Sequence, residues 1–328
     1  IIDSRDLRFF HEPAGQLTTL SGLYLNGYWA NGRPSIVDAV IVDWMRSPFH
    51  RAHKGALMAV RPDEMAGQVA RALLSRNNIL ADQIDDLLLG CAYPEGEQGY
   101  NVARLVSFLS GLPDTVPGAT FNRLCGSSME AIHVAAGKIS TGSGNCFLVG
   151  GMESMSRVKR RGFNWCPHPG LEESYPEAYI NMGITAENVA DKYSISRIRQ
   201  EEFALSSHEK SHLALLEGNF ENEICAIVHG EETIDSDGCI RPSSNLESMA
   251  GLNPVFKETG TVTAATSSPL TDGVAFCIVC SEGFAIENGL NPIARIVSTS
   301  VTGCPPELMG LGPIAASRLC LERAGWSI

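Results

Sequence analysis

The feature that most restricts the fold of this chain is a regular alternation of short apolar runs with amphipathic segments, beginning near Ile36. The segments between the runs carry apolar residues at helical spacing, and one of them begins with Pro62 and two acidic residues, as helix N-termini often do. Strands that alternate with helices favour a mostly parallel sheet covered on both faces, so we expect an α/β fold. Four runs have the length of buried strands: residues 35–44, 84–93, 118–124 and 145–151.

The alternation stops near Ser156 and resumes after Ser268, which indicates a long insertion. The run after residue 290 is similar in composition to the opening strand, so a second copy of the first half is expected to start there. Because the chain begins with Ile1 and stops soon after a helical pattern, we expect a fragment cut at both ends. The predicted parts are an N-terminal extension (1–35), a first half (36–155 and 269–290), an inserted loop domain (156–268) and an incomplete second half (291–328).

Composition excludes several classes of protein. The net charge of −12 argues against general nucleic-acid binding, and no apolar run is long enough for a membrane span. The ten cysteines are scattered. Cys277 and Cys280 form the closest pair, but at i and i+3 of a strand they point to opposite faces, and no metal site is predicted. Free thiols indicate a reducing compartment, so we expect a cytoplasmic protein.

Cys125 is the candidate catalytic residue, because it lies where a predicted strand turns into a helix, in the segment "FNRLCGSSMEAI". Unpaired N–H groups at a helix start stabilise a thiolate, and Gly126 gives a substrate close access. The helix is expected to turn Met129, Ile132 and Ile139 toward the core. A cysteine acyl-enzyme is a thioester, which suits exchange with other thioesters. The alternative is that Cys125 only packs in the core, as most cysteines do.

The segment "NRLCGSSMEAI" resembles the nucleophile motif of the thiolase family, which includes 3-ketoacyl-CoA thiolases and acetyl-CoA acetyltransferases. Four further stretches, in the same order, are similar to motifs of that family: "VGGMESMS", "MGITAENVADKYSISRIRQEEFA", "GTVTAATSSPLTDGVA" and "MGLGPIAASRLCLERAGW". The resemblance implies a thiolase-like fold. Two similar halves, each a mixed sheet covered by helices, form αβαβα layers in the complete protein, and a loop domain is inserted in the first half.

The resemblance also implies the chemistry. Cys125 would attack a 3-ketoacyl-CoA, release acetyl-CoA and pass the shortened acyl group to free CoA in fatty-acid β-oxidation, or catalyse the reverse condensation. Its backbone N–H would be one oxyanion donor. Ser268 matches a serine that contacts the pantetheine of CoA, Met182 a methionine of the acyl channel, and Arg241, less closely, a residue that faces the nucleotide. CoA would be a co-substrate with no permanently bound cofactor. A homodimer or tetramer and a hydratase–dehydrogenase partner subunit are the implied partners.

The sequence departs from the family's pattern at several places. The Asn-Glu-Ala-Phe, Gly-His-Pro and Cys-x-Gly-x-Gly motifs, which carry the catalytic histidine and second cysteine, do not occur, so these 328 residues alone are expected to be inactive. Asn181 stands where some acetoacetyl-forming members have histidine, which favours the degradative, longer-chain branch. Ala265 and Pro269 replace residues that are commonly glycine, so the loop that carries Ser268 is expected to be stiffer.

Other readings remain open at this point. The chain could be an acetoacetyl-CoA-forming biosynthetic thiolase or a non-catalytic acyl-CoA-binding protein. A different class of enzyme is suggested by His208-Glu-Lys-Ser-His212, which has the H-E-x-x-H spacing of zinc peptidases. No third ligand is evident, however, and a solvated helix is the simpler interpretation. The basic run 157–161 could steer an anionic substrate or could simply be a solvated loop.

Overall fold

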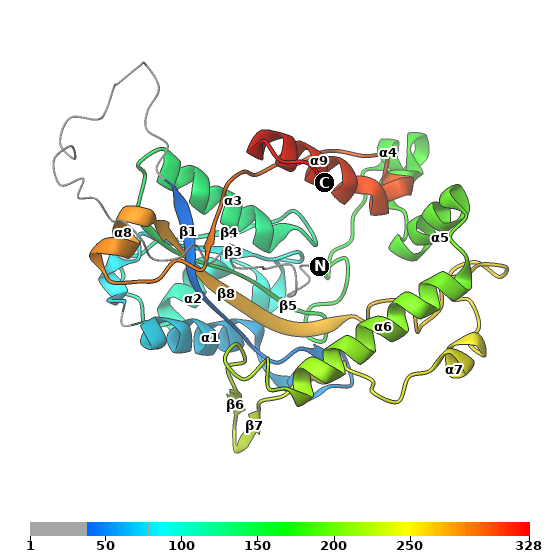
Figure 1. The fold of residues 1–328 in the computed structure, drawn as a ribbon, viewed down its shortest axis with the longest axis horizontal. Helices are drawn as coiled ribbons and strands as arrows, with labels where there is room; N and C mark the ends of the chain where they lie inside the picture. The colour runs from blue at the N-terminus through cyan, green and yellow to red at the C-terminus, as the bar shows by residue number, and fades with distance from the viewer. Residues whose placement is uncertain (1–37, 78) are drawn as a thin grey trace, which may run out of the picture. The chain divides into compact units, whose positions relative to one another are not determined.

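The computed structural model of this chain describes residues 38–77 and 79–328, so the expected extension at 1–35 lies outside the described residues. A seven-stranded sheet has the order β4-β3-β5-β8-β1-β9, with β2 also paired to β8 (Figure 1). Its strands are β1 (Ala39–Arg46), β2 (His50–Arg51), β3 (Asp86–Gly90), β4 (Gly118–Phe121), β5 (Cys146–Ser154), β8 (Thr271–Ser281) and β9 (Ala294–Arg295).

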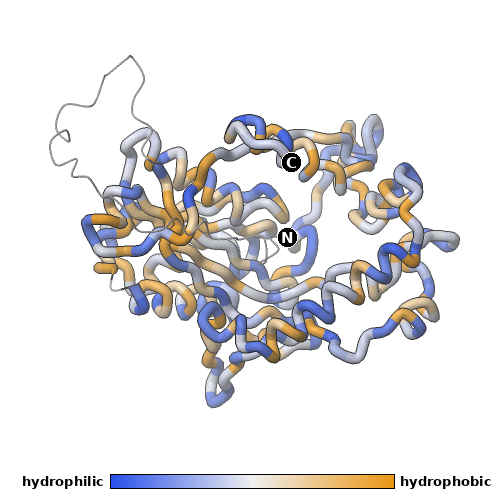
Figure 2. The backbone as a smooth tube through the Cα atoms, in the orientation of Figure 1, coloured by the Kyte–Doolittle hydropathy of each residue, from blue (hydrophilic) through white to orange (hydrophobic). Residues whose placement is uncertain are grey.

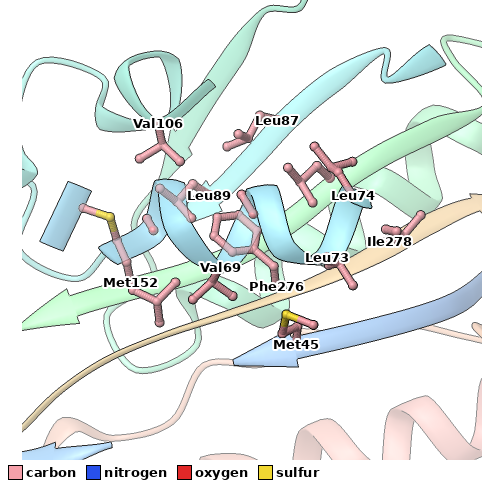
Figure 3. Packing of buried hydrophobic residues seen from close by; sticks show 14 of the residues in the cluster. Met45, Val69, Leu73, Leu74, Leu87, Leu89, Val106, Met152, Phe276 and Ile278 are labelled. Carbon is pink, nitrogen blue, oxygen red and sulfur yellow. The ribbon is translucent and has the colours of Figure 1, made fainter. Parts of the chain in front are cut away.

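Helices cover both faces of this sheet, as the alternation predicted. α1 (Pro62–Asn77) and α2 (Val102–Leu109) pack on one face, and α3 (Ser127–Ser140) packs on the other. β3 is buried on both faces, since Leu87 and Leu89 lie in the core with α1 while Leu88 contacts the core with α3. Figure 3 shows the first of these cores, and Figure 2 shows hydrophobic segments running through the strands. α8 (Glu282–Glu287) follows β8.

The sheet is mixed rather than mostly parallel, so the expectation from strand alternation alone was wrong on this point. β3, β4 and β5 are parallel, but β8 pairs antiparallel with both β5 and β1. The reason lies in the long segment between β5 and β8. This segment returns the chain to the end of the sheet where β5 stopped, so β8 must run in the opposite direction. The mixed sheet implied by the family resemblance is the one observed.

The connection between β5 and β8 carries elements of its own. Its assignment as an inserted domain, and that of the last residues as the start of a second half, stay predictions. The connection contains α4 (Pro169–Ser174), α5 (Met182–Tyr193), α6 (Arg197–Leu216), β6 (Ile227–His229), β7 (Glu232–Ile234) and α7 (Leu246–Ala250), and α9 (Gly312–Ala324) lies near the end of the chain.

Two sequence expectations about side chains have different outcomes. Cys277 and Cys280 do face opposite sides of β8, because each contacts a different core. Met129, expected to face inward, is 55% exposed. The helix begins at Ser127 and buries the faces of Ala131, Ala135 and Ile139, with Ile132 only partly covered, so Met129 lies on the outer side of the first turn.

Arg46 at the end of β1 anchors the connecting segment to the sheet. Its Nη1 and Nη2 atoms donate to the two carboxylate oxygens of Asp237, each at 2.8 Å, and its Nε donates to Glu223 at 2.7 Å. Asp237 also accepts a bond of 2.8 Å from the Phe49 N–H. The side chains of Arg46 and Asp237 are only 15% and 11% exposed, so little water screens their interaction.

We expect Asp237→Asn to lower the free energy of unfolding by about 3 kcal/mol, because it leaves the guanidinium of Arg46 largely buried beside a neutral group. The matched control is Glu64→Gln, which removes an exposed carboxylate 3.7 Å from Arg71 and should cost no more than about 0.5 kcal/mol. Urea denaturation of both variants measures the difference. Equal losses would contradict the anchoring role.

Candidate functional site

Cys125 lies in the tight turn between β4 and α3, and it is exposed. The preceding residue, Leu124, has φ +47°, a left-handed conformation that a bulky side chain rarely adopts. The Ser127 hydroxyl holds the turn from inside: it accepts from the Arg123 N–H at 2.9 Å and donates to the Leu124 carbonyl at 2.5 Å. Within the described residues, no side chain hydrogen-bonds the Cys125 thiol, which leaves the sulfur open to a reactant.

Two glycines form the seat on which the first turn of α3 rests. Gly90 ends β3, and Gly151 lies opposite it in β5. A Cβ atom on Gly90 would lie 2.3 Å from the backbone of Ser127 and Ser128, and one on Gly151 would lie 2.6 Å from the Ser128 Cβ. Any side chain at either position would therefore push the start of the helix, and Cys125 with it, away from the sheet.

The sheet topology brings Ser268 to the same end of the sheet as Cys125, that is, to the end where β4 and β5 stop. Cys125 follows the carboxyl end of β4, which runs parallel to β3 and β5. β8 runs antiparallel to β5, with Asp272 opposite Ser154, so β8 starts at the end of the sheet where β5 stops. Ser268 is exposed and precedes β8 by only a few residues. The segments that carry Ser268 and Cys125 therefore lie at the same end of the sheet, where β4 and β5 stop and β8 starts.

Met182 and the loop that carries Ser268 are joined through a buried acid that the sequence analysis missed. Met182 begins α5 and is 37% exposed. One and a half turns later on the same helix, Glu187 is 1% exposed and accepts bonds of 3.0 Å and 2.8 Å from the N–H groups of Thr261 and Val262. Gly260 is required beside it, because a Cβ there would lie 2.2 Å from the Glu187 carboxylate. Glu187 therefore fixes the start of the loop against α5.

The structure does not bring Arg241 to the segments that carry Met182 and Ser268. It is exposed, and its backbone N–H donates to His208 Nδ1 of α6 at 3.3 Å. Within the described residues, its polar contacts are this bond and one from the Ser244 N–H to its carbonyl, and neither reaches the segments that carry Met182 or Ser268. Asn181 has a local role: its side chain accepts from the Gly183 N–H at 2.8 Å and caps α5.

Comparison with known proteins identifies the family. Residues 39–283 match the family model described as "Thiolase, N-terminal domain". The chain belongs to the thiolase family. It is 44% identical over 299 residues to a 3-ketoacyl-CoA thiolase of Serratia proteamaculans (strain 568), covering 89% of this chain and 77% of that protein. It is 43% identical over 298 residues to the 3-ketoacyl-CoA thiolase of Saccharophagus degradans, covering 89% and 76%.

Solved structures give the same result for the fold. The crystal structure of the Bacillus anthracis acetyl-CoA acetyltransferase superposes with a TM-score of 0.80 at 36% identity, covering 89% of this chain and 78% of that one. The structure of human mitochondrial 3-ketoacyl-CoA thiolase superposes with a TM-score of 0.80 at 32% identity, covering 89% and 77%. The predicted thiolase fold is therefore confirmed.

His133 on α3 and the two histidines singled out from the sequence, His208 and His212, give no sign of acting on Cys125. His133 lies two turns along α3, with its Nδ1 3.7 Å from the Glu130 carboxylate, and burial lowers its pKa although Glu130 opposes this shift. Burial, and then the charge of Arg241, also lower the pKa of His208. Among residues 38–77 and 79–328, no group of three or more His, Cys, Asp or Glu side chains could hold a metal ion. A zinc site at His208 and His212 thus lacks a third ligand in this part of the chain.

The basic run at 157–161 is partly used in internal contacts. Arg157 pairs with Glu97, and the Arg161 guanidinium lies 4.5 Å over the ring of Trp165. In the described part of the chain, no helix has both the length and the apolar content that crossing a bilayer requires.

We expect Gly90→Ala to slow the alkylation of Cys125 by iodoacetamide by at least about tenfold, because the new methyl group would displace the start of α3. The control is Gly137→Ala, which lies on the same helix and whose added Cβ would meet nothing within 4 Å. Mass spectrometry of the Cys125 peptide measures the rate. Parallel rates in the two variants would refute the glycine seat.

Proposed function

We propose that this protein is an acetyl-CoA C-acyltransferase, which cleaves 3-ketoacyl-CoA with CoA through a Cys125 acyl-enzyme in fatty-acid β-oxidation. The observation that carries the proposal is the exposed Cys125 thiol on a strained strand–turn–helix, in the segment whose resemblance to the family implies the nucleophile. The named 3-ketoacyl-CoA thiolases at 43–44% identity support this substrate class over the acetoacetyl-forming alternative.

The chemistry at Cys125 balances in two steps. The thiolate attacks the keto carbon, the Cα–Cβ bond breaks, and acetyl-CoA leaves as an enolate that takes up the proton lost from the thiol. The CoA thiol then gives its proton to the cysteine sulfur as it attacks the acyl carbon, and shortened acyl-CoA leaves. Each addition places negative charge on an oxygen, and we propose that the Cys125 N–H is one of the donors that stabilises it.

We propose that the CoA chain approaches Cys125 across the end of the sheet where β5 stops and β8 starts, because Ser268 lies there. Ser268 and Met182 are both solvent-accessible, and Glu187 links the segments that present them. These features support a pantetheine contact at Ser268 and an acyl-channel contact at Met182. Arg241 has the weakest support, because none of its polar contacts in the described residues reaches these segments.

Thiolysis of a 3-ketoacyl-CoA by the protein with its natural termini tests the proposal. We expect Cys125→Ser to lower kcat by at least about 10⁴-fold, because a serine hydroxyl without a base is a far weaker nucleophile than a thiolate. Cys166→Ser is the control, since Cys166 is also exposed but lies in the loop before α4. It should keep wild-type activity.

Other outcomes would decide against the proposal. Full activity of Cys125→Ser would exclude Cys125 as the nucleophile. Acyl-CoA binding without turnover, even with natural termini, would favour the non-catalytic binding protein. That residues 1–328 alone are inactive stays a prediction, which the same assay on this segment tests.

We further propose a homodimer formed along the open edge of β4. Among the described residues β4 pairs only with β3, and the carbonyls of Pro117 and Phe121 accept the bonds from that side. The backbone groups of Thr120, at the alternate position, therefore point to the open edge. A shallow hollow of about 430 Å³ runs beside this edge and is lined by Pro94, Tyr100, Asn101, Gly118, Ala119, Thr120 and Asn122.

Light scattering on the eluting protein should give twice the 35.3 kDa of one chain, or a larger even multiple. Thr120→Pro removes the outward N–H without touching the bonds to β3, so we expect it to shift the protein to monomer. Thr120→Val is the control, because it removes only the hydroxyl that bonds Asn101 and accepts from Ala103. A Thr120→Pro dimer would place the interface elsewhere.

Compartment and partner subunit remain proposals of coarser support. All ten cysteines are free thiols in the structure, which supports a reducing, cytoplasmic location. A hydratase–dehydrogenase partner subunit is proposed from the family resemblance alone.

A further inference from the structure

A second set of hydrogen bonds holds the Cys125 turn, and it ties the turn to another loop. The left-handed Leu124 is an unfavourable conformation, so neighbouring groups must maintain it. Its backbone N–H donates to the Asn122 Oδ1 at 2.9 Å, a short side-chain-to-backbone bond that favours a turn. The Nδ2 of the same side chain donates to the Ala92 carbonyl at 3.0 Å. One carboxamide thus joins the nucleophile turn to the loop that follows β3.

That loop is itself held rigidly from the sheet. The Ala92 N–H donates to Glu153 Oε2 at 2.7 Å, and Gln98 Nε2 donates to Glu153 Oε1 at 2.6 Å. Gln98 is fully buried and also accepts from the Ser154 N–H at 2.6 Å. Glu153 lies near the end of β5, and burial raises its pKa. The acceptor at Ala92 therefore belongs to a closed hydrogen-bond network that is tied to two strands.

We propose that Asn122 is a positioning residue for Cys125: its carboxamide transmits the geometry of the Glu153 network to Leu124 and so aims the cysteine. This inference rests on the proposed function for its kinetic consequence, although its structural part does not. Asn122 needs both of its polar atoms, since one must accept from Leu124 and the other must donate to Ala92. An aspartate could keep the first bond but would meet the Ala92 carbonyl with a second acceptor.

Asn122→Asp therefore separates the two bonds. Its matched control is Asn288→Asp, just after α8 and beyond the end of β8 that lies away from Cys125. Asn288 likewise uses both polar atoms of its side chain, since Nδ2 donates to the Phe284 carbonyl at 2.9 Å and Oδ1 accepts from Gln83 at 2.9 Å. Asn122→Ser serves as a second variant if the aspartate disturbs folding. A serine hydroxyl can still accept from the residue two positions on, yet it lacks the donor reach to Ala92.

The experiment measures two quantities in the protein with its natural termini: the rate of iodoacetamide alkylation of the Cys125 peptide, and kcat with KM for thiolysis. For Asn122→Asp we expect both the alkylation rate and kcat to fall by at least about tenfold while KM changes by less than about threefold. Asn288→Asp should change neither by more than about twofold. Asn122→Ser should resemble Asn122→Asp, and thermal melting should show that all variants are folded.

The two arms separate the failure of this inference from failure of the proposed function. If Asn122→Asp and Asn122→Ser both alkylate like Asn288→Asp, the positioning role is refuted, whatever the enzyme's activity. If their alkylation slows but the wild-type protein has no thiolase activity, the positioning role stands and the proposed function falls. A fall in melting temperature with wild-type alkylation and kcat would assign Asn122 a purely structural role.

Discussion

The candidate site depends on how closely the first turn of α3 can approach the sheet. Gly90 and Gly151 lie side by side on β3 and β5, and the backbone of Ser127 and Ser128 occupies the space that their side chains would need. This contact fixes the height of Cys125 above the strand ends. The strained Leu124 and the bonds of Ser127 then fix its direction. A nucleophile must be both accessible and held in a fixed direction, and this turn meets both conditions for the Cys125 thiol.

The candidate site also requires that the loop before β8, which is distant in the sequence, reaches the end of the sheet where Cys125 lies. The antiparallel course of β8 meets this requirement, because a strand that runs against β5 must begin where β5 ends. The loop before β8 is then fastened to α5 by Glu187, a carboxylate that is almost fully buried. Such a group is tolerated only when donors surround it, and the N–H groups of Thr261 and Val262 provide them. The segments that carry Cys125 and Ser268 thus reach the same end of the sheet through the course of the strands, and no hydrogen bond joins these two side chains in the described residues.

Much of the fold could be predicted from the sequence, since the period of apolar residues distinguishes strands from helices locally. The runs that become β1, β3, β4 and β5, and the helices between them, were expected close to where they occur. Cys125 could be found because its signal is also local: a strand, a cysteine, glycine and serines, then a helix. The inward face of α3 was misjudged at Met129, because periodicity gives the faces of a helix but not where its first turn leaves the sheet.

The sequence by itself determined the α/β class, the thiolase resemblance and the identity of the candidate nucleophile, because each rests on residues that are neighbours in the chain. Only the tertiary structure decided the direction of β8, the close contact of Gly90 and Gly151 with α3, and the hydrogen-bond partners of Glu187 and Asn122. Glu187 and Val262 are 75 residues apart, and Asn122 and Ala92 are 30 apart. Hydrogen bonds over such separations leave no periodic pattern, and they form only when the packed core brings the partners within about 3 Å.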